Sequence, residues 1–567
     1  VDSSSKMVDG ILSGSMTFLG IYDQCLNTTV PHPKMKEKVL FRGQYCLTEI
    51  RSPLPRKSRR YNLYDQVDEL RNFSGTDVVK FLSTRAHFHY ILPFRAGLCV
   101  PSGCTKNDLN QLLSIVSEKL LLNFHVSHCE VKKEEIKLTA IQIFAIIICC
   151  FLVTLVLLGT WLEIRTRGKE NAYQHVGYRF LSCFSMITNF KRLASTKTSS
   201  NSLKCLHGLR FLSITWVVMG HCYFFPGWFI RSYRSLFFIE HVATEPIAQM
   251  IINGSEAVDT FFFMSGLLCM VHTWYVSCDF QLYLASLIVI FPLLKSEKIG
   301  IAVNILIIVI SIIYSGIITY IGKIIPTVIM TQPDPIDRNL GYLYTYGNTL
   351  SRAGPYFIGI LTGYLLIKYP EVKIPKTFQV IGWCLATLSS GLVVFITGAW
   401  YKIRPPSPLE VLLYATFYKV AFTIGVAWLT FCCITGRGGI LNDFLSWKVW
   451  VPLSKLTFLI YLIQPIFQTL FIANFKSTQE YSHLFFIIQF FGFLCISSLL
   501  AMICNLLVES PFLSLEKLLL KADNGKKEMD VDTYKVSDGL NAIKMNGKRN
   551  ETKLENCSEN LAFDSKL

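Results

Sequence analysis

The stretch 139-TAIQIFAIIICCFLVTLVLLGTWLE-163 decides the class of this protein. It carries no charge before its final glutamate, and it is longer than the roughly 20 apolar residues that an α-helix needs to cross a bilayer. The loop that follows, residues 164–204, is strongly basic. Cytoplasmic loops of membrane proteins are rich in Lys and Arg. The pattern therefore predicts a first transmembrane helix at 139–163, a cytoplasmic loop at 164–204 and an extracellular or lumenal domain at 1–138.

The composition of the whole chain agrees with a membrane protein. The 567 residues are 51% hydrophobic and only 17% charged, with a mean hydropathy of +0.40. Soluble domains are less apolar than this. The net charge of +16 would suggest a nucleic-acid partner in a soluble protein. Here the basic residues gather between apolar runs, so we attribute the charge to cytoplasmic loops and predict no nucleic-acid partner.

Further apolar runs predict an all-α polytopic membrane bundle of about nine to ten helices. The second span covers 206–225, and later runs lie near 299–320, 350–368, 377–399, 410–434, 450–473 and 484–508. Between them, the stretch 257–294 is too long for one span and too short for two spans with a loop. Charge alternation places the ectodomain outside and the polar tail, 511–567, in the cytoplasm if this stretch crosses once in net terms. We expect the Lys-rich part of the tail, residues 521–567, to be disordered.

Residues 1–138 predict a disulfide-bonded ectodomain of mixed, partly helical pattern, with a helix at 107–124. The candidate disulfide cysteines are Cys25, Cys46, Cys99, Cys104 and Cys129. The tight turn from Cys99 to Cys104 favours a disulfide between these two residues. Because the number of cysteines is odd, one thiol is left unpaired. Because the sequence starts at Val1, we infer that a signal peptide and a sixth cysteine precede it. N-glycosylation sequons begin at Asn27, Asn72 and Asn253, which also indicates an oxidising compartment.

Two ionisable residues in the second span are the catalytic candidates. Eleven residues, about three helical turns, separate Arg210 from His221, so both share one face. A histidine suits general-base chemistry, but a lone intramembrane histidine is more often a packed hydrogen-bonding residue. The candidates for support of a site are five polar residues in later runs: Asp259, Ser265, Asp279, Gln281 and Arg352. Polar side chains are costly in lipid, so Asp259, Asp279, Gln281 and Lys419 should face the bundle interior. For Asp279 and Lys419, a structural pair that holds helices together is as good an explanation as a functional role. Zinc-ligand spacings and phosphate or dinucleotide loops are absent from the sequence, so we predict no bound metal or cofactor.

Several separated motifs occur together: LHGLR at 206–210 before His221, VDTFFFMSG at 258–266, HTWYVSCDFQLY at 272–283 and RAGPYFIGILTG at 352–363. In this order they resemble the acyltransferase 3 family. Around its cysteines the ectodomain has YDQC at 22–25, GQYC at 43–46 and GLCVPSGC at 97–104. These segments resemble the N-terminal domain of the animal "nose resistant to fluoxetine" branch. The resemblance covers nearly all of 1–515 and implies an acyltransferase 3-like transmembrane domain at 205–510.

The resemblance implies transfer of an acyl group from a cytoplasmic thioester, acyl-CoA as co-substrate, to a hydroxyl of a lipid or other small hydrophobic acceptor. His221 would be the base and Arg210 its partner, because a guanidinium binds phosphate in a fork geometry or orients the imidazole. Membrane lipid would be a partner in a plasma membrane or endomembrane. Two alternatives remain open: a lipid or drug uptake protein that kept the fold without the chemistry, and a receptor-like module that binds ligand through its ectodomain.

The sequence departs from the family pattern in two places. The family has a loop and another span between the segments that here join at Met270 and Val271, so domain 205–510 has an apparent internal deletion. Gln464 stands where the family often has histidine, and a glutamine cannot act as a base. The two departures leave open an active acyltransferase and an inactive chain, and they favour the uptake alternative slightly.

Overall fold

The computed structural model describes residues 2–6, 10–34, 39–54, 77–89, 93–120, 122–132, 138–166, 176–197, 203–224, 232–233, 235–268, 274–324, 340–370, 372–402, 406–480 and 482–519. It divides into two compact units. Unit 1 comprises 1–135, 215–435 and 465–493, and unit 2 comprises 136–214, 436–464 and 494–567. The predicted junction at 270/271, Asn72 and the tail beyond residue 519 lie outside the described residues.

The ectodomain is built on a five-stranded sheet whose order is β1-β4-β3-β2, with β5 also paired to β3. Its strands are β1 (Thr17–Phe18), β2 (Thr29–Pro31), β3 (Val39–Arg51), β4 (Phe94–Pro101) and β5 (Asn123–Val131). The long strand β3 runs antiparallel to β2, β4 and β5, whereas β1 is parallel to β4. Short helical segments complete it: η1 (Ile11–Ser13), α1 (Tyr22–Asn27), α2 (Asp77–Thr84) and α3 (Ala86–His89).

Helix α4 (Lys106–Leu120) confirms the predicted helix, although it ends earlier than expected. Its first turn is fixed by Asp108, whose carboxylate accepts 2.8 Å hydrogen bonds from the backbone N–H and the hydroxyl of Thr105. These hydrogen bonds favour the ionised form and lower the pKa of Asp108. Leu109 of α4 packs on Cys46 and Val126 of the sheet. The helix therefore covers the core through which one disulfide passes.

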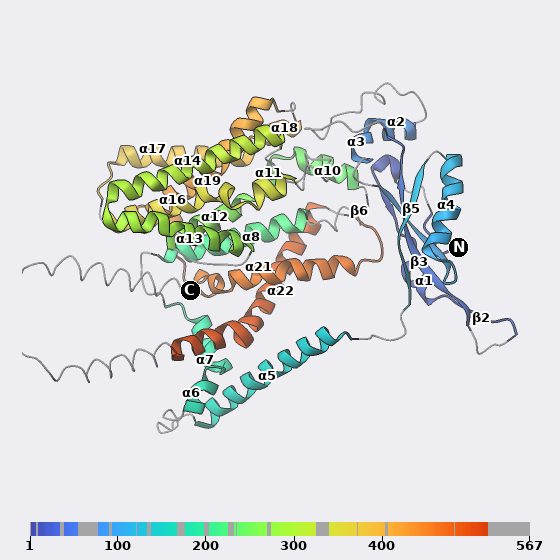
Figure 1. Cartoon of the computed structure of the whole chain (residues 1–567), viewed down its shortest axis with the longest axis horizontal. Coiled ribbons are helices and arrows are strands. Elements are labelled where there is room, and N and C mark those ends of the chain that lie inside the picture. Colours follow the sequence, from blue (N-terminus) through green and yellow to red (C-terminus); the bar gives the residue numbers. More distant parts are fainter. Residues whose placement is uncertain are drawn as a thin grey trace, which may run out of the picture. The chain divides into compact units, whose positions relative to one another are not determined.

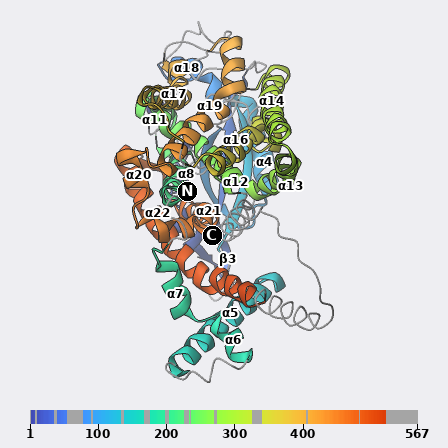
Figure 2. The ribbon, with the colours of Figure 1, turned by 90° about the vertical axis from the view of Figure 1, so that its left-hand side faces the viewer.

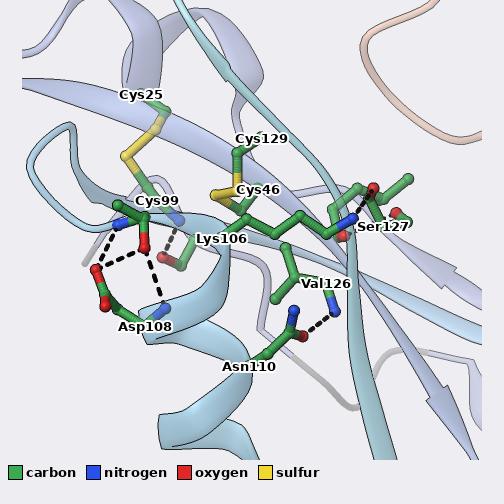
Figure 3. The surroundings of a disulfide bond; sticks show 12 residues. Cys25, Cys46, Cys99, Lys106, Asp108, Asn110, Val126, Ser127 and Cys129 are labelled. Atoms are coloured by element: carbon green, nitrogen blue, oxygen red, sulfur yellow. Dashed lines mark hydrogen bonds between the residues drawn. A yellow bond between two sulfur atoms is a disulfide. The ribbon is translucent and has the colours of Figure 1, made fainter.

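Two disulfides connect this domain (Figure 3), Cys25–Cys99 and Cys46–Cys129. Cys46 and Cys129 lie directly opposite each other on β3 and β5, so the register of the sheet sets that pair. The predicted disulfide between Cys99 and Cys104 is wrong. Cys99 lies on β4 and pairs with Cys25 of α1, whereas Cys104 is a free thiol in a turn closed by its backbone N–H on Pro101 O.

Removing the Cys46–Cys129 disulfide by a double alanine substitution is expected to cost the ectodomain about 2–5 kcal/mol of stability. The bond closes a chain segment with a sequence separation of 83, which restricts the unfolded state strongly. Thermal unfolding of the full chain, read out by proteolysis of the ectodomain, measures the change. Cys104→Ala is the matched control: Cys104 is a free, half-buried thiol at the edge of the same core, and its removal breaks no disulfide, so it should cost no more than about 1 kcal/mol. Equal stability of the two variants would contradict the prediction.

Among the described residues, eight helical segments are long and apolar enough to cross a membrane: Ala140–Thr166, Ser277–Lys295, Glu297–Gly322, Leu343–Lys368, Lys376–Trp400, Pro408–Ile434, Trp450–Ala473 and His483–Leu519. They confirm the predicted polytopic helical architecture. Helix α8 (Lys204–Phe224) covers the predicted second span. The last segment continues past residue 511, so the first residues of the predicted polar tail extend this helix.

The anomalous stretch 257–294 forms two helices, α12 (Glu256–Leu268) and α13 (Trp274–Lys295). Helix α12 packs closely on α16 (Thr349–Lys368). A Cβ on Gly266 would lie 1.9 Å from the carbonyl oxygen of Tyr356, so only glycine permits this approach. The length of this stretch fits neither one span nor two because it contains a short buried helix followed by a longer one.

The remaining helices of unit 1 surround α16, whose residues from Ser351 to Ile360 are buried. Helix α14 (Glu297–Gly322) contacts α13, α16 and α19 (Pro408–Ile434), and α17 (Lys376–Phe395) contacts α19. Figure 1 shows these helices side by side, and Figure 2 views them nearly end-on. Ser407 and Glu410 form a capping box that starts α19, and Asn348 caps α16. Smaller elements of this unit are β6 (Ser232–Tyr233), α10 (Ser235–Thr244), α11 (Pro246–Ile252), η4 (Tyr342–Tyr346), α18 (Gly398–Lys402) and β7 (Gln479–Glu480).

Unit 2 contains the first transmembrane helix, α5 (Ala140–Thr166), and the basic loop after it. Part of that loop folds into α6 (Val176–Ser182) and α7 (Met186–Ala194). Glu163 of α5 accepts hydrogen bonds from Ser185 and Thr188 at the start of α7. Lys455 caps the other end of α7 by donating to three backbone carbonyls. Other elements of unit 2 are α20 (Gly439–Leu445) and η5 (Asn505–Glu509), with parts of α21 (Trp450–Ala473) and α22 (His483–Cys504).

Candidate functional site

Helix α8 carries both predicted catalytic residues. Each is half-buried, and the helix is continuous between them, as the spacing predicted. Arg210 belongs to unit 2 and His221 to unit 1. Each residue is therefore placed by its own surroundings, and their action as a pair stays a prediction.

The part of α8 around His221 is fixed by contacts on both sides of the residue. Trp216 donates its indole N–H to Met250 O of α11 at 2.7 Å. Cys222 is fully buried, and Gln468 of α21 donates to its sulfur at 3.4 Å. Tyr223 stacks on Phe486 of α22 with ring centroids 4.3 Å apart. These contacts hold the helix and therefore give the His221 side chain a rigid base.

The LHGLR motif has a packing role of its own within unit 2. His207 Nδ1 lies 2.6 Å from Ser454 Oγ of α21. A Cβ on Gly208 would lie 2.4 Å from Leu445 O of α20, so the glycine allows two backbones to meet. Phe211 stacks on Trp450 with centroids 5.4 Å apart. The motif thus anchors the half of α8 from which Arg210 projects, and sequence reasoning did not assign this role to His207 or Gly208.

A cluster of four buried charged residues lies between α12, α16 and α19 in unit 1. Asp259 and Arg352 form an ion pair with 2.5 Å between Oδ1 and Nη1, and their side chains are 0% and 2% exposed. Arg352 Nε also donates to Tyr346 O at 2.9 Å, and the guanidinium lies over the Tyr346 ring. The other members are Glu256 and Lys419, both buried. We call Glu256, Asp259, Arg352 and Lys419 the charge cluster.

Lys419 and Glu256 add one positive and one negative side chain to the Asp259–Arg352 pair. Lys419 Nζ donates to Thr345 O at 2.7 Å and to the hydroxyl of Ser351. Glu256 lies just before Asp259 on α12 and accepts a 3.2 Å hydrogen bond from Ser255. Two acids face two bases, which is the arrangement in which ionised side chains tolerate a membrane interior. Sequence reasoning missed Glu256, which stands two residues before the VDTFFF motif.

Four of the five predicted supporting residues form two pairs around these helices, and Gln281 bonds to a residue outside the set. Besides Asp259 with Arg352, Ser265 donates to Asp279 Oδ2 at 3.2 Å, and Thr349 donates to Gln281 Oε1 at 2.8 Å. Asp259, Asp279, Gln281 and Lys419 were expected to face the bundle interior. That expectation is confirmed for Asp259, Asp279 and Lys419, which are buried, and Ser265 and Arg352 are buried as well. Gln281 is exposed, so that expectation is wrong for it.

Three polar atoms of the charge cluster have no hydrogen-bond partner among the residues that the structure describes: Glu256 Oε2, Asp259 Oδ2 and Arg352 Nη2. Buried polar atoms are nearly always satisfied in native proteins. Water or a polar part of a ligand is therefore a suitable partner for them. The cluster offers both acceptors and a donor to such a group.

The predicted glycosylation at Asn253 is contradicted by the structure. Asn253 is 3% exposed, and its amide nitrogen donates to Val394 O at 2.7 Å and to the Thr397 hydroxyl at 2.8 Å. A glycan replaces one of the two hydrogens on that nitrogen, so at least one of these bonds would be lost, and the buried side chain leaves no room for a sugar. Asn27 is exposed and accepts a hydrogen bond from Lys132, so glycosylation there stays a prediction.

Comparison with known proteins assigns both parts of the chain. Residues 1–113 match the nose resistant-to-fluoxetine protein N-terminal domain, and residues 266–505 match the acyltransferase domain. The resemblance to the acyltransferase 3 family, in its nose resistant-to-fluoxetine branch, is confirmed. The acyltransferase domain match includes Arg352 and Gln464 but begins after α8. The roles of Arg210 and His221 therefore rest on the motif alone.

A curated relative aligns with most of the chain. The chain is 24% identical, over an alignment 655 positions long, to nose resistant to fluoxetine protein 6 of Caenorhabditis elegans. The alignment covers 93% of this chain and 78% of that protein. No solved structure matches the chain.

Proposed function

We propose that this protein is a membrane-bound O-acyltransferase that moves an acyl group from acyl-CoA to a hydroxyl of a lipid or another small hydrophobic acceptor. The observation that carries the proposal is the acyltransferase domain match over residues 266–505. The buried charge cluster within the same bundle supports it, because intramembrane ionisable residues are costly and mark functional sites by default. The disulfide-bonded ectodomain would lie on the extracellular or lumenal side.

In the proposed reaction, His221 takes the proton of the acceptor hydroxyl as general base. The acceptor oxygen attacks the thioester carbonyl, a C–O bond forms, and the C–S bond breaks. The CoA thiolate leaves and takes up the proton. Arg210 would hold the phosphates of the donor, since guanidinium pairs with phosphate through two parallel hydrogen bonds.

An uptake protein for lipids or drugs is the second candidate. Gln464 favours it, because it occupies the position where the family often has histidine and cannot act as a base. Gln464 is 1% exposed on α21. A charge-balanced interior also suits a binding protein that moves its ligand across the membrane.

The full chain reconstituted in lipid vesicles separates the two candidates. It is given acyl-CoA labelled in the acyl group, and two quantities are followed: label recovered as ester in the lipid fraction, and free CoA thiol. We expect one thiol for each ester formed, at a rate that protein-free vesicles do not show. Accumulation of lipid or drug without release of CoA would reject the acyltransferase and support uptake.

A further inference from the structure

Two histidines and a glutamate from distant parts of the chain converge outside the charge cluster. His241 lies on α10, Glu245 directly follows that helix, and His483 begins α22. Nε2 of His241 lies 3.0 Å from Glu245 Oε1, and Nε2 of His483 lies 3.0 Å from Glu245 Oε2. One ligand atom from each residue lies within 4.8 Å of the other two. All three belong to unit 1.

The composition and spacing of this group fit a transition-metal ion. Two histidines and one glutamate form a known three-ligand set for zinc with an open fourth position. Two ligand atoms at about 2.0–2.1 Å from one tetrahedral Zn²⁺ lie about 3.3 Å apart, close to both nitrogen–oxygen distances here. Glu245 comes four residues after His241, directly beyond the end of α10, and the 3.0 Å contact shows that the two side chains meet there.

Tyr223 adds an observation independent of the three ligands. Its hydroxyl lies 3.1 Å from Nδ1 of His483, the ring nitrogen that does not face Glu245. A metal-binding histidine almost always donates its second ring N–H to an oxygen, which leaves the other nitrogen unprotonated for the metal. Tyr223 is 3% exposed, so its hydroxyl is held in place. It is therefore suited to orient the His483 ring.

The helices that carry His241 and His483 are connected by ring stacking and strand pairing close to these residues. Phe486 of α22 lies between Tyr223 of α8, at 4.3 Å, and Phe238 of α10, at 5.2 Å between ring centroids. Strands β6 and β7, which precede α10 and α22, pair with each other. Gln249 of α11 donates to the backbone carbonyl of Glu245 at 3.4 Å. The ligands are thus presented by a packed framework and not by separate surface side chains.

We propose that His241, Glu245 and His483 bind one divalent transition-metal ion, with Zn²⁺ the best fit, and that Tyr223 orients His483. The side chains of His241 and His483 are 58% and 42% exposed, which leaves water or a substrate group access to a fourth position. The ion would tie the ends of α10 and α22 together. This site does not depend on the proposed acyl transfer.

Metal analysis of the full chain tests the site. The protein is purified in detergent through a tag that contains no histidine, and zinc is measured per chain. Parent protein is expected to hold about one ion, and Co²⁺ in its place should give the visible absorption of a tetrahedral site. Glu245→Gln and His483→Ala should lose the ion, whereas His128→Ala, an exposed ectodomain histidine, should keep it. Parent protein without stoichiometric metal would overturn the proposal, because hydrogen bonds from the two imidazoles to the Glu245 carboxylate would then explain the contacts.

A second variant keeps the test valid if a ligand variant fails to fold. Tyr223→Phe retains all three ligands and the ring stack, and it should weaken zinc binding by about 10–100-fold. Chelator should lower the unfolding temperature of the parent but not that of Glu245→Gln. Equal zinc affinity of Tyr223→Phe and parent would remove the orienting role of Tyr223. An identical response of parent and Glu245→Gln to chelator would overturn the site.

Discussion

Replacing His221 with alanine is expected to lower the rate of acyl transfer by about 10²–10⁴-fold, the usual contribution of a general base. The acceptor hydroxyl would lose the group that takes its proton, while the donor would still bind through other contacts. The loss should therefore fall on kcat, with the KM for acyl-CoA nearly unchanged. The measurement is labelled ester formed by the reconstituted full chain at saturating acyl-CoA.

Two matched variants separate this role from damage to the helix. Cys222→Ala alters the next residue of α8, which is buried and bonded to Gln468, and should retain most of the activity. Arg210→Lys should raise the KM for acyl-CoA by about tenfold, because an ammonium cannot make the two parallel bonds of a guanidinium. If His221→Ala transferred label as fast as the parent, His221 would be a packing residue and the assigned base would be lost.

The membrane helices could be predicted from the sequence because hydropathy is a local property. The predicted span 450–473 coincides with α21, and 139–163 differs from α5 by a few residues at its ends. The number of helices in the stretch 257–294 could not be predicted, because hydropathy does not show where one apolar helix ends and the next begins. Its division into α12 and α13 depends on packing, as the close approach of Gly266 to Tyr356 shows.

Pairing between distant residues could not be predicted. Cys46 meets Cys129 because the strands β3 and β5 align them, and that register does not appear in the spacing of cysteines. Burial of Asp259 was expected from the cost of charge in lipid, but its ion pair with Arg352 follows from the packing of α12 on α16. The histidine–glutamate group escaped the search for zinc-ligand spacings for the same reason. Its third member, His483, is far from His241 and Glu245 in the sequence.

Replacing Arg352 with methionine is expected to destabilise the protein by about 3–5 kcal/mol, because Asp259 would remain as an unpaired buried charge. Both side chains are almost completely inaccessible. Thermal unfolding of the full chain in nanodiscs measures the loss. The exposed pair Lys368–Glu297 is the control, with side chains 32% and 45% exposed, and Lys368→Met should cost less than about 1 kcal/mol.

The double variant Asp259→Leu with Arg352→Met decides what the pair is for. Removing both charges together leaves no uncompensated ion, and replacement of a buried pair by apolar residues is often neutral or stabilising. We therefore expect the double variant to recover most of the stability that Arg352→Met loses.

If the double variant also transfers acyl groups at the parent rate, the pair only holds α12 against α16. If it folds but transfers little, the atoms of Asp259 and Arg352 that have no partner among the described residues bind a reacting group. A double variant as unstable as the single one would contradict the assignment of the loss to an unpaired charge, since no unpaired charge would then remain between the two helices.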